Sequence, residues 1–261
     1  MFQFLKQHEN YKELIWVLAK TDFKLRYHGS VLGYVWALLQ PLAMFAVLNF
    51  VFSSIFARGG GEPFYSLQLI VGIMMFTFFS EGTSSGMKSL LSKSQLITKT
   101  YVPKWTIILS STIHSVLTYL MSLIIVVVFF IWKGLVPSFG AVMMFLFFSF
   151  LIYVIIVSFS FLTASLFIRF RDLAMIWGVV TQMLFYATPI VYPLKTMTEN
   201  MQQLLLANPL AFIVHFTKES LINDHFPDLW QINFFIVLLL LIFIISIFVY
   251  KKTSKGIAEN F

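Results

Sequence analysis

The chain has 261 residues, of which 59% are hydrophobic and only 11% are charged, and its mean hydropathy is +0.87. A soluble domain carries about 25% charged residues, so this composition excludes a large soluble domain and indicates an all-α integral membrane protein. The absence of cysteine excludes disulfides, a thiol nucleophile and Cys-ligated metal sites. In a membrane protein, a net charge of +7 indicates cytoplasmic loops and contact with anionic lipid more than nucleic acid.

Residues 1–28 alternate apolar side chains with Lys and Glu at near-helical spacing, which predicts an amphipathic interface helix. Two interpretations stay open: the helix lies on the inner membrane surface, or it is a solvated segment that only marks topology. The first apolar run, from Val31 to Phe56, holds 26 residues without a charge, enough to cross a bilayer core. The five cations before it indicate a cytoplasmic N-terminus.

The rest of the chain, 29–261, is predicted to form one transmembrane domain with six spans. The predicted spans are residues 31–56, 66–87, 105–132, 139–168, 173–188 and 230–250. Residues 189–229 are only moderately apolar and contain four prolines. Such a broken segment favours re-entrant half-helices over about 189–220, buried against protein, because lipid cannot satisfy an irregular backbone. An outer loop with a surface helix is the alternative.

The distribution of Lys and Arg supports this topology. Fourteen of the 18 cations fall in predicted inner segments and four in predicted outer ones. By the positive-inside rule, both termini are expected in the cytoplasm.

Several kinds of chemistry have no sequence signature here. No glycine is followed by Lys, so the chain has no Walker A motif and no ATP site of that kind. The five histidines are scattered, and no metal site or other cofactor is predicted in this chain. Glu81 is the only acidic residue inside a predicted span. One carboxylate is weak support for proton coupling, so the energy for any transport is expected to come from elsewhere.

Three motifs point in one direction. They are RYHGSVLGYVWALLQP at 26–41, RFRD at 169–172, and ATPIVYP at 187–193 followed by Asn208-Pro209-Leu210. Together they resemble the permease subunit of type-2 ABC exporters of cell-envelope polysaccharides, the family that exports O-antigen, capsule and teichoic acid. The resemblance covers essentially the whole chain, including the number of spans and the amphipathic N-terminus.

The resemblance implies a homodimer of permeases in the cell inner membrane, joined by two separate nucleotide-binding ATPase subunits. ATP and Mg²⁺ would bind to those subunits, in agreement with the absent Walker A motif. It also implies a channel for a lipid-linked polysaccharide on an undecaprenyl (pyro)phosphate carrier. No nucleic-acid partner is expected.

The resemblance also assigns a role to the inner loop 88–104, which would carry the helix that docks in a cleft of the ATPase. The candidate contacts are Leu90, Leu91, Leu96, Ile97 and Tyr101. The alternative is an ordinary basic inner loop, but a solvated loop has no need of so many apolar residues among its lysines.

The junction of the surface helix with span one corresponds, by resemblance, to the gate where the carrier headgroup enters. The gate candidates are Lys24, Arg26, Tyr27 and His28. A guanidinium can bind phosphate oxygens through two parallel hydrogen bonds, which favours Arg26. The alternative is that these cations only anchor the topology.

Aromatic side chains can contact sugar rings without reading each hydroxyl. Channel candidates of this kind are Tyr34, Trp36, Trp177 and Tyr186, although most of the 31 phenylalanines are expected to face lipid or other helices. Arg169, Arg171 and Asp172 form an inner turn, where Asp172 is expected to cap the helix of span five and the arginines to contact lipid phosphate or a partner.

Two other functions stay open from the sequence. One is a type-2 ABC permease for a drug or a small lipid, against which the entry motif argues. The other is a membrane-embedded glycosyl or acyl transferase, which would need catalytic Asp, Glu or His in a motif that the outer loops lack.

Overall fold

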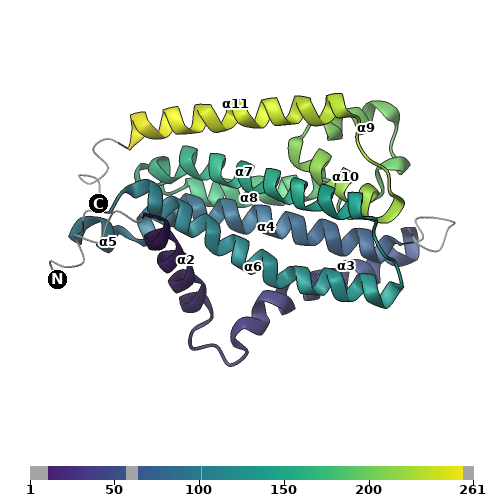
Figure 1. The fold of residues 1–261 in the computed structure, drawn as a ribbon, viewed down its shortest axis with the longest axis horizontal. Helices are drawn as coiled ribbons and strands as arrows, with labels where there is room; N and C mark the ends of the chain where they lie inside the picture. Colours follow the sequence, from purple (N-terminus) through teal and green to yellow (C-terminus); the bar gives the residue numbers. More distant parts are fainter. Residues whose placement is uncertain (1–10, 57–63, 101, 255–261) are drawn as a thin grey trace.

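The computed structural model describes residues 11–56, 64–100 and 102–254, and these are helical and contain no strand (Figure 1). The short elements are α2 (Tyr11–Tyr27), η1 (Gly33–Val35), α5 (Ser94–Lys99), α8 (Leu173–Ala187), η2 (Leu194–Thr196), α9 (Glu199–Leu206) and α10 (Pro209–Asn223). The long helices are α3 (Trp36–Phe56), α4 (Tyr65–Ser92), α6 (Lys104–Lys133), α7 (Phe139–Arg169) and α11 (Leu229–Thr253). Within the described residues, these five are long and apolar enough to cross a membrane. The prediction of an all-α integral membrane protein is therefore confirmed.

Helix α4 forms the centre of the bundle. It packs most extensively against α7 and α6, and it also contacts α3, α8 and α10. Figure 1 shows the long helices side by side, with α11 on the far side of α7 from α4. Most of the apolar side chains of α4 are buried, whereas α3 and α11 leave much of their apolar surface exposed. Those exposed faces are left for lipid or for another protein chain.

Two glycines allow α4 to approach α7 closely. A Cβ atom on Gly82 would lie 2.6 Å from the side chain of Ile156, and one on Gly86 would lie 1.8 Å from the hydroxyl of Ser160. Small residues four apart are a common device for helix contact in membranes, where packing replaces the hydrophobic drive. The spacing of Gly82 and Gly86 therefore sets the distance between the two most tightly packed helices.

The chain is broken after α8, and residues 188–191 at this break are buried in protein. α8 has 15 residues and is about 22 Å long, shorter than a bilayer core of about 30 Å. The chain then folds inward, with Ile190 packed against Gly72 of α4. Two carbonyls freed by the break are satisfied by side chains: Tyr65 donates to Val191 at 2.7 Å, and the Lys218 ammonium donates to Pro189.

α9 and α10 follow this break, and α10 is buried against α4 and α7. Short helices are thus present in this segment, but their re-entrant character, their depth in a membrane and the total of six spans stay predictions. One residue counted among the outer cations, Lys218, lies inside α10 and is 4% exposed.

The N-terminal helix α2 packs along the first half of α6. Its buried residues are Ile15, Ala19 and Tyr27, which share one face of the helix. The Tyr11 ring lies against Trp105, with centroids 5.5 Å apart. An amphipathic helix is therefore present over residues 11–27, with one face covered by protein; residues 1–10 of the predicted helix lie outside the described part.

We expect the end of the bundle that carries α5 to face the cytoplasm. The end of α4, the start of α6 and the end of α11 meet there, and Lys104 donates to the carbonyl of Ser254 at 3.1 Å. On this cysteine-free chain, an impermeant maleimide added to intact cells should label Val136→Cys but reach Lys99→Cys only after permeabilisation. Both positions are exposed. Labelling of Lys99→Cys from outside would contradict the orientation.

We expect Gly86→Ala to destabilise the folded protein by about 1–3 kcal/mol, because the new methyl group overpacks the contact with Ser160. Thermal unfolding in detergent measures this effect. Ser160→Gly in the same chain removes the clashing atoms and should recover most of the loss. Gly178→Ala is the matched control, since a Cβ there meets open space among the described residues. Equal melting temperatures for the Gly86 and Gly178 variants would contradict the close-packing argument.

Candidate functional site

A tight turn carries the chain from α2 into α3. Gly29 has φ +80°, a left-handed conformation that a residue with a Cβ adopts at a cost, and Ser30 N–H donates to the carbonyl of Tyr27. Lys24 and Arg26 lie in the last turn of α2, where cations are favoured by the helix dipole. The predicted turn from surface helix to span one is thus present, and it leaves Arg26 beside the middle of α4.

Arg26 forms a two-pronged ion pair with Glu81. Its Nη2 donates to Oε1 at 2.8 Å and its Nη1 to Oε2 at 3.3 Å, and the two side chains are 35% and 18% exposed. Bidentate pairs of this kind are strong and specific in geometry. The single carboxylate of the predicted spans is thereby neutralised by the interface helix, so Arg26 is not an unoccupied phosphate ligand in this conformation.

A polar cavity of about 370 Å³ opens beside this ion pair. Its lining residues are Arg26, Gln40, Ser80, Glu81, Ser84, Ser85 and Lys88. Positions 81, 84, 85 and 88 share one face of α4, because residues three and four apart lie together on a helix. Two cations, one carboxylate and several hydroxyl donors give this cavity the chemistry of a site for an anion.

Aromatic rings close the other side of the junction. Phe23 of α2 stacks on Tyr34 at 5.2 Å, and Tyr27 lies 5.5 Å from each of these rings. Tyr27 is buried against α6, and this burial raises the pKa of its phenol, although the Arg26 guanidinium and a hydrogen bond with Thr118 act in the opposite direction. The Tyr27 hydroxyl therefore faces α6 rather than the cavity.

The remaining gate and channel candidates are not gathered in one place. Lys24, His28, Trp36 and Tyr186 are exposed. Trp177 instead faces inward: its indole N–H donates to Thr83 at 3.1 Å, and its ring stacks on Phe159 at 3.9 Å. These contacts attach α8 to the bundle, so Trp177 is a packing residue here. The channel role of these aromatic residues stays a prediction.

The inner loop 88–104 is helical at its centre, but its apolar residues face inward. Leu90 is fully buried, and Leu96 and Ile97 pack against the same apolar cluster at the inner end of α6 and α7. Leu91 is half-buried, and Tyr101 lies outside the described residues. The exposed residues of α5 are Gln95, Thr98 and Lys99, and the docking of this loop with an ATPase stays a prediction.

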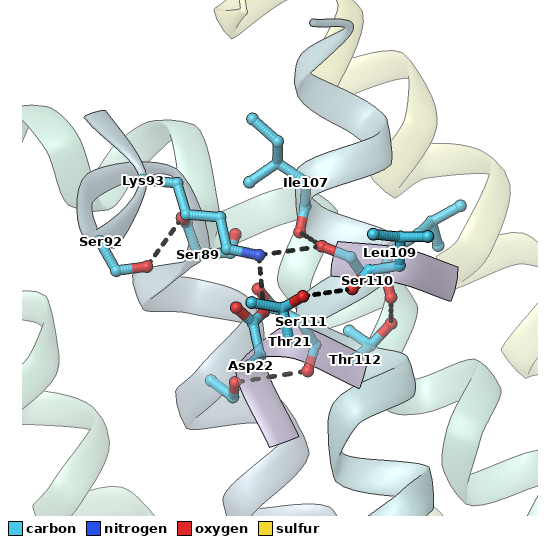
Figure 2. Close-up of polar contacts among 12 residues, drawn as sticks. Thr21, Asp22, Ser89, Ser92, Lys93, Ile107, Leu109, Ser110, Ser111 and Thr112 are labelled. Carbon is cyan, nitrogen blue, oxygen red and sulfur yellow. Dashed lines mark hydrogen bonds and ion pairs between the residues drawn. The ribbon is translucent and has the colours of Figure 1, made fainter. Parts of the chain in front are cut away.

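Lys93 ties this loop to the N-terminal helix (Figure 2). Its ammonium donates to Asp22 of α2 at 2.6 Å and to the hydroxyl of Ser110 of α6 at 3.2 Å. The side chains of Lys93 and Asp22 are 14% and 25% exposed. The partly buried ammonium of Lys93 therefore joins the end of α4 to both α2 and α6.

The inner turn between α7 and α8 differs from its prediction in one respect. Asp172 lies at the N-cap position of α8, as expected, but its side chain makes no capping hydrogen bond within the described part of the chain. Its backbone is already in the helical region, with φ −64° and ψ −17°, whereas a capping side chain normally needs an extended residue. Arg169 and Arg171 are exposed beside it.

Comparison with known proteins identifies the family. The sequence model of the family described as ABC-2 type transporter matches residues 13–222. The chain belongs to the ABC-2 type transporter family. It is therefore a membrane permease of an ABC transporter, rather than an enzyme, and it acts with an ATPase partner.

Curated relatives of this ABC-2 protein carry related names. The O-antigen export system permease protein RfbA of Klebsiella pneumoniae is 29% identical over 213 residues, which are 81% of each chain. The protein of the same name from Myxococcus xanthus is 25% identical over 235 residues, 87% of each chain. The polysialic acid transport protein KpsM of Escherichia coli is 20% identical over 253 residues, 95% of this chain and 96% of that protein.

Arg26 and Glu81 of this permease stand out separately in its sequence, but their pairing was not predicted. The roles of Asp22 and Lys93, and the place of Lys88 in the cavity, were not predicted either. A signal was available, because a carboxylate in a membrane span needs a partner inside the protein, and Arg26 is the last cation before span one. Nothing in the sequence separated Lys93 from the other lysines of its loop.

Proposed function

We propose that this chain is the channel-forming permease subunit of an ATP-driven exporter that moves cell-envelope polysaccharide outward across the inner membrane. The observation that carries the proposal is the alignment, over 81% to 95% of this chain, with permeases named for O-antigen export and a protein named for polysialic acid transport. Both names denote polysaccharide transport, although the sequence identity of these relatives to this chain ranges from 20% to 29%. The alignments span 81% to 95% of this chain, and the family model itself matches residues 13–222, which include α2 and the residues that line the cavity.

The assembly that we propose is a homodimer with two ATPase subunits. The faces left exposed on α3 and α8 suit contact between protomers, because side chains such as Phe50, Met175 and Met183 are apolar and uncovered. The channel would then lie between two copies, with exposed aromatics such as Trp36 and Tyr186 available to sugar rings.

For the substrate, we propose a polymer on a lipid carrier with a phosphate or pyrophosphate group. The cavity beside Arg26 has the donors that such a group needs, and Lys88 adds a second cation at its edge. In the proposed step, the carrier phosphate replaces the Glu81 carboxylate as the partner of Arg26. This exchange gives the entering phosphate a cationic partner, because an unpaired charge at membrane depth would be costly. Lys88, which lines the same cavity, is then the cation that remains to pair with Glu81.

The proposal is tested by deleting the gene and measuring surface polysaccharide per cell. We expect loss of the polymer, with recovery by the wild-type chain. Arg26→Ala should restore little export, and Arg26→Lys only part, because Lys keeps the charge but loses the two-pronged geometry. Lys12→Ala, exposed at the other end of α2, is the control and should restore export fully.

The double variant Arg26→Ala/Glu81→Gln separates two explanations of an Arg26 defect. If the defect comes from an unpaired Glu81, removing its charge should restore export. The carrier proposal expects the double variant to stay defective while still inserting into the membrane and binding the ATPase. Unchanged surface polymer on deletion would instead favour a permease for a small lipid or drug, and polysaccharide export would be rejected.

ATPase docking is expected on the exposed side of α5. Thr98→Asp with Lys99→Glu should lower co-purification of the ATPase without changing the amount of inserted permease, because both side chains are exposed. Lys133→Glu, exposed at the opposite end of α6, is the control. Leu96→Asp with Ile97→Asp is less informative, since it also removes α5 from its apolar cluster. Normal co-purification of the Thr98/Lys99 variant would move the docking surface elsewhere.

A further inference from the structure

Lys93 belongs to two helices at once. It ends α4 and begins α5, with φ −113° and ψ 27°, so the helix axis changes direction at this residue. Its carbonyl accepts hydrogen bonds from the N–H groups of Leu96 and Ile97 at 3.0 and 3.1 Å, which are the first bonds of α5. Any displacement of α5 therefore acts on the backbone of Lys93 directly.

The side chain of the same residue holds α2. The ammonium lies between Asp22 and Ser110, and Ser110 uses its own proton to donate to the carbonyl of Ile107 at 2.9 Å. Ser110 is thus committed as an acceptor for Lys93, and the lysine has a fixed position against α6. A short charge-assisted bond in a partly dry site is stronger than a neutral hydrogen bond and restricts movement of Asp22 relative to α5.

A second ion pair of α2 lies one turn further along the helix. Arg26, four residues after Asp22, is bound to Glu81 in the middle of α4 and lines the polar cavity. A shift of α2 that is imposed at Asp22 therefore reaches the Arg26 side chain through a single helical turn. The start of α5 is therefore linked to the cavity through Lys93, Asp22 and the turn of α2 that leads to Arg26.

We propose that Lys93 is a positioning residue that passes displacement of α5 to α2 through Asp22, so that ATPase movement alters the cavity at Arg26. This proposal rests on the proposed function, since it takes α5 as the ATPase docking helix. Coupling of this kind is carried by packed or bonded groups between two sites, when both sites shift the same structural equilibrium. The link here consists of one backbone position, one ion pair and one helical turn.

The test compares Lys93→Met with the parent permease in complex with its ATPase. Lys93→Met keeps the length of the side chain and removes its charge. We expect ATP hydrolysis to change little while export per ATP hydrolysed falls on the order of tenfold. The charge-exchanged variant Asp22→Lys/Lys93→Asp should recover part of this export.

A covalent link gives an independent readout on this cysteine-free chain. In Asp22→Cys/Lys93→Cys, export should be low and should rise when a flexible bifunctional thiol reagent joins the two positions. Normal export by Lys93→Met, a fall of export only in proportion to ATP hydrolysis or protein amount, or inactivation by the linker would each overturn the proposal.

Nucleotide-driven movement of α2 separates this inference from the polysaccharide proposal. A bimane label on Lys20→Cys, exposed on α2, should change its fluorescence when ATP is added to the complex, and the Lys93→Met substitution should abolish the change. If the parent complex shows the change but deletion leaves surface polysaccharide intact, the exporter proposal fails and the coupling stands. If Lys93→Met retains the change, the coupling fails whatever the substrate.

Discussion

A carboxylate in a membrane-spanning helix must find a positive partner inside the protein, and this requirement places α2. Glu81 lies in the middle of α4, and its side chain is only 18% exposed. Burial without a partner would cost several kcal/mol. The partner comes from the interface helix, 55 residues earlier, because Arg26 is the last cation before the first long apolar run. The fold of the N-terminal region follows from this pairing, since α2 has to lie along α6 for Arg26 to reach Glu81.

The same requirement acts on the backbone where α8 ends. A chain that breaks at membrane depth exposes carbonyl groups that lipid cannot satisfy. Here Val191 and Pro189 receive hydrogen bonds from Tyr65 and Lys218, on two different helices. Lys218 is a charged residue at a buried position for this reason, and counting it as a loop cation misplaces it. Polar contacts therefore hold α2 and the segment after α8 against the bundle of long helices.

The long helices could be predicted from the sequence because hydropathy and length alone define them. Three predicted spans, 66–87, 105–132 and 139–168, lie inside α4, α6 and α7, and α4 continues beyond the end of its predicted span. The predicted span stopped before Lys88 because a cation ends an apolar run, whereas the helix continues to Ser92. For the inner loop, the sequence leaves two interpretations open. Its apolar residues signal contact, but composition does not say whether Leu90 and Leu96 meet a partner or the chain's own core. Helix phase relative to α6 and α7 decides this, and it is a property of the packed bundle.

The close apolar packing of the long helices and the polar contacts of the irregular segments differ in how easily they can change. This difference indicates where a transport cycle can change the structure. α4, α6 and α7 meet through close-packed side chains and glycine contacts such as Gly86 against Ser160, which leave no room for sliding. α2 and the segment after α8 are held by ion pairs and hydrogen bonds, which exchange partners with water or with an anionic headgroup at little net cost. A packed interface moves between discrete arrangements only when its whole surface rearranges, whereas a two-pronged ion pair is replaced one bond at a time. At the ion pairs of α2, an anionic ligand can therefore replace a carboxylate of the protein as the partner of a cation. The close-packed helices α4, α6 and α7 stay in place during this exchange.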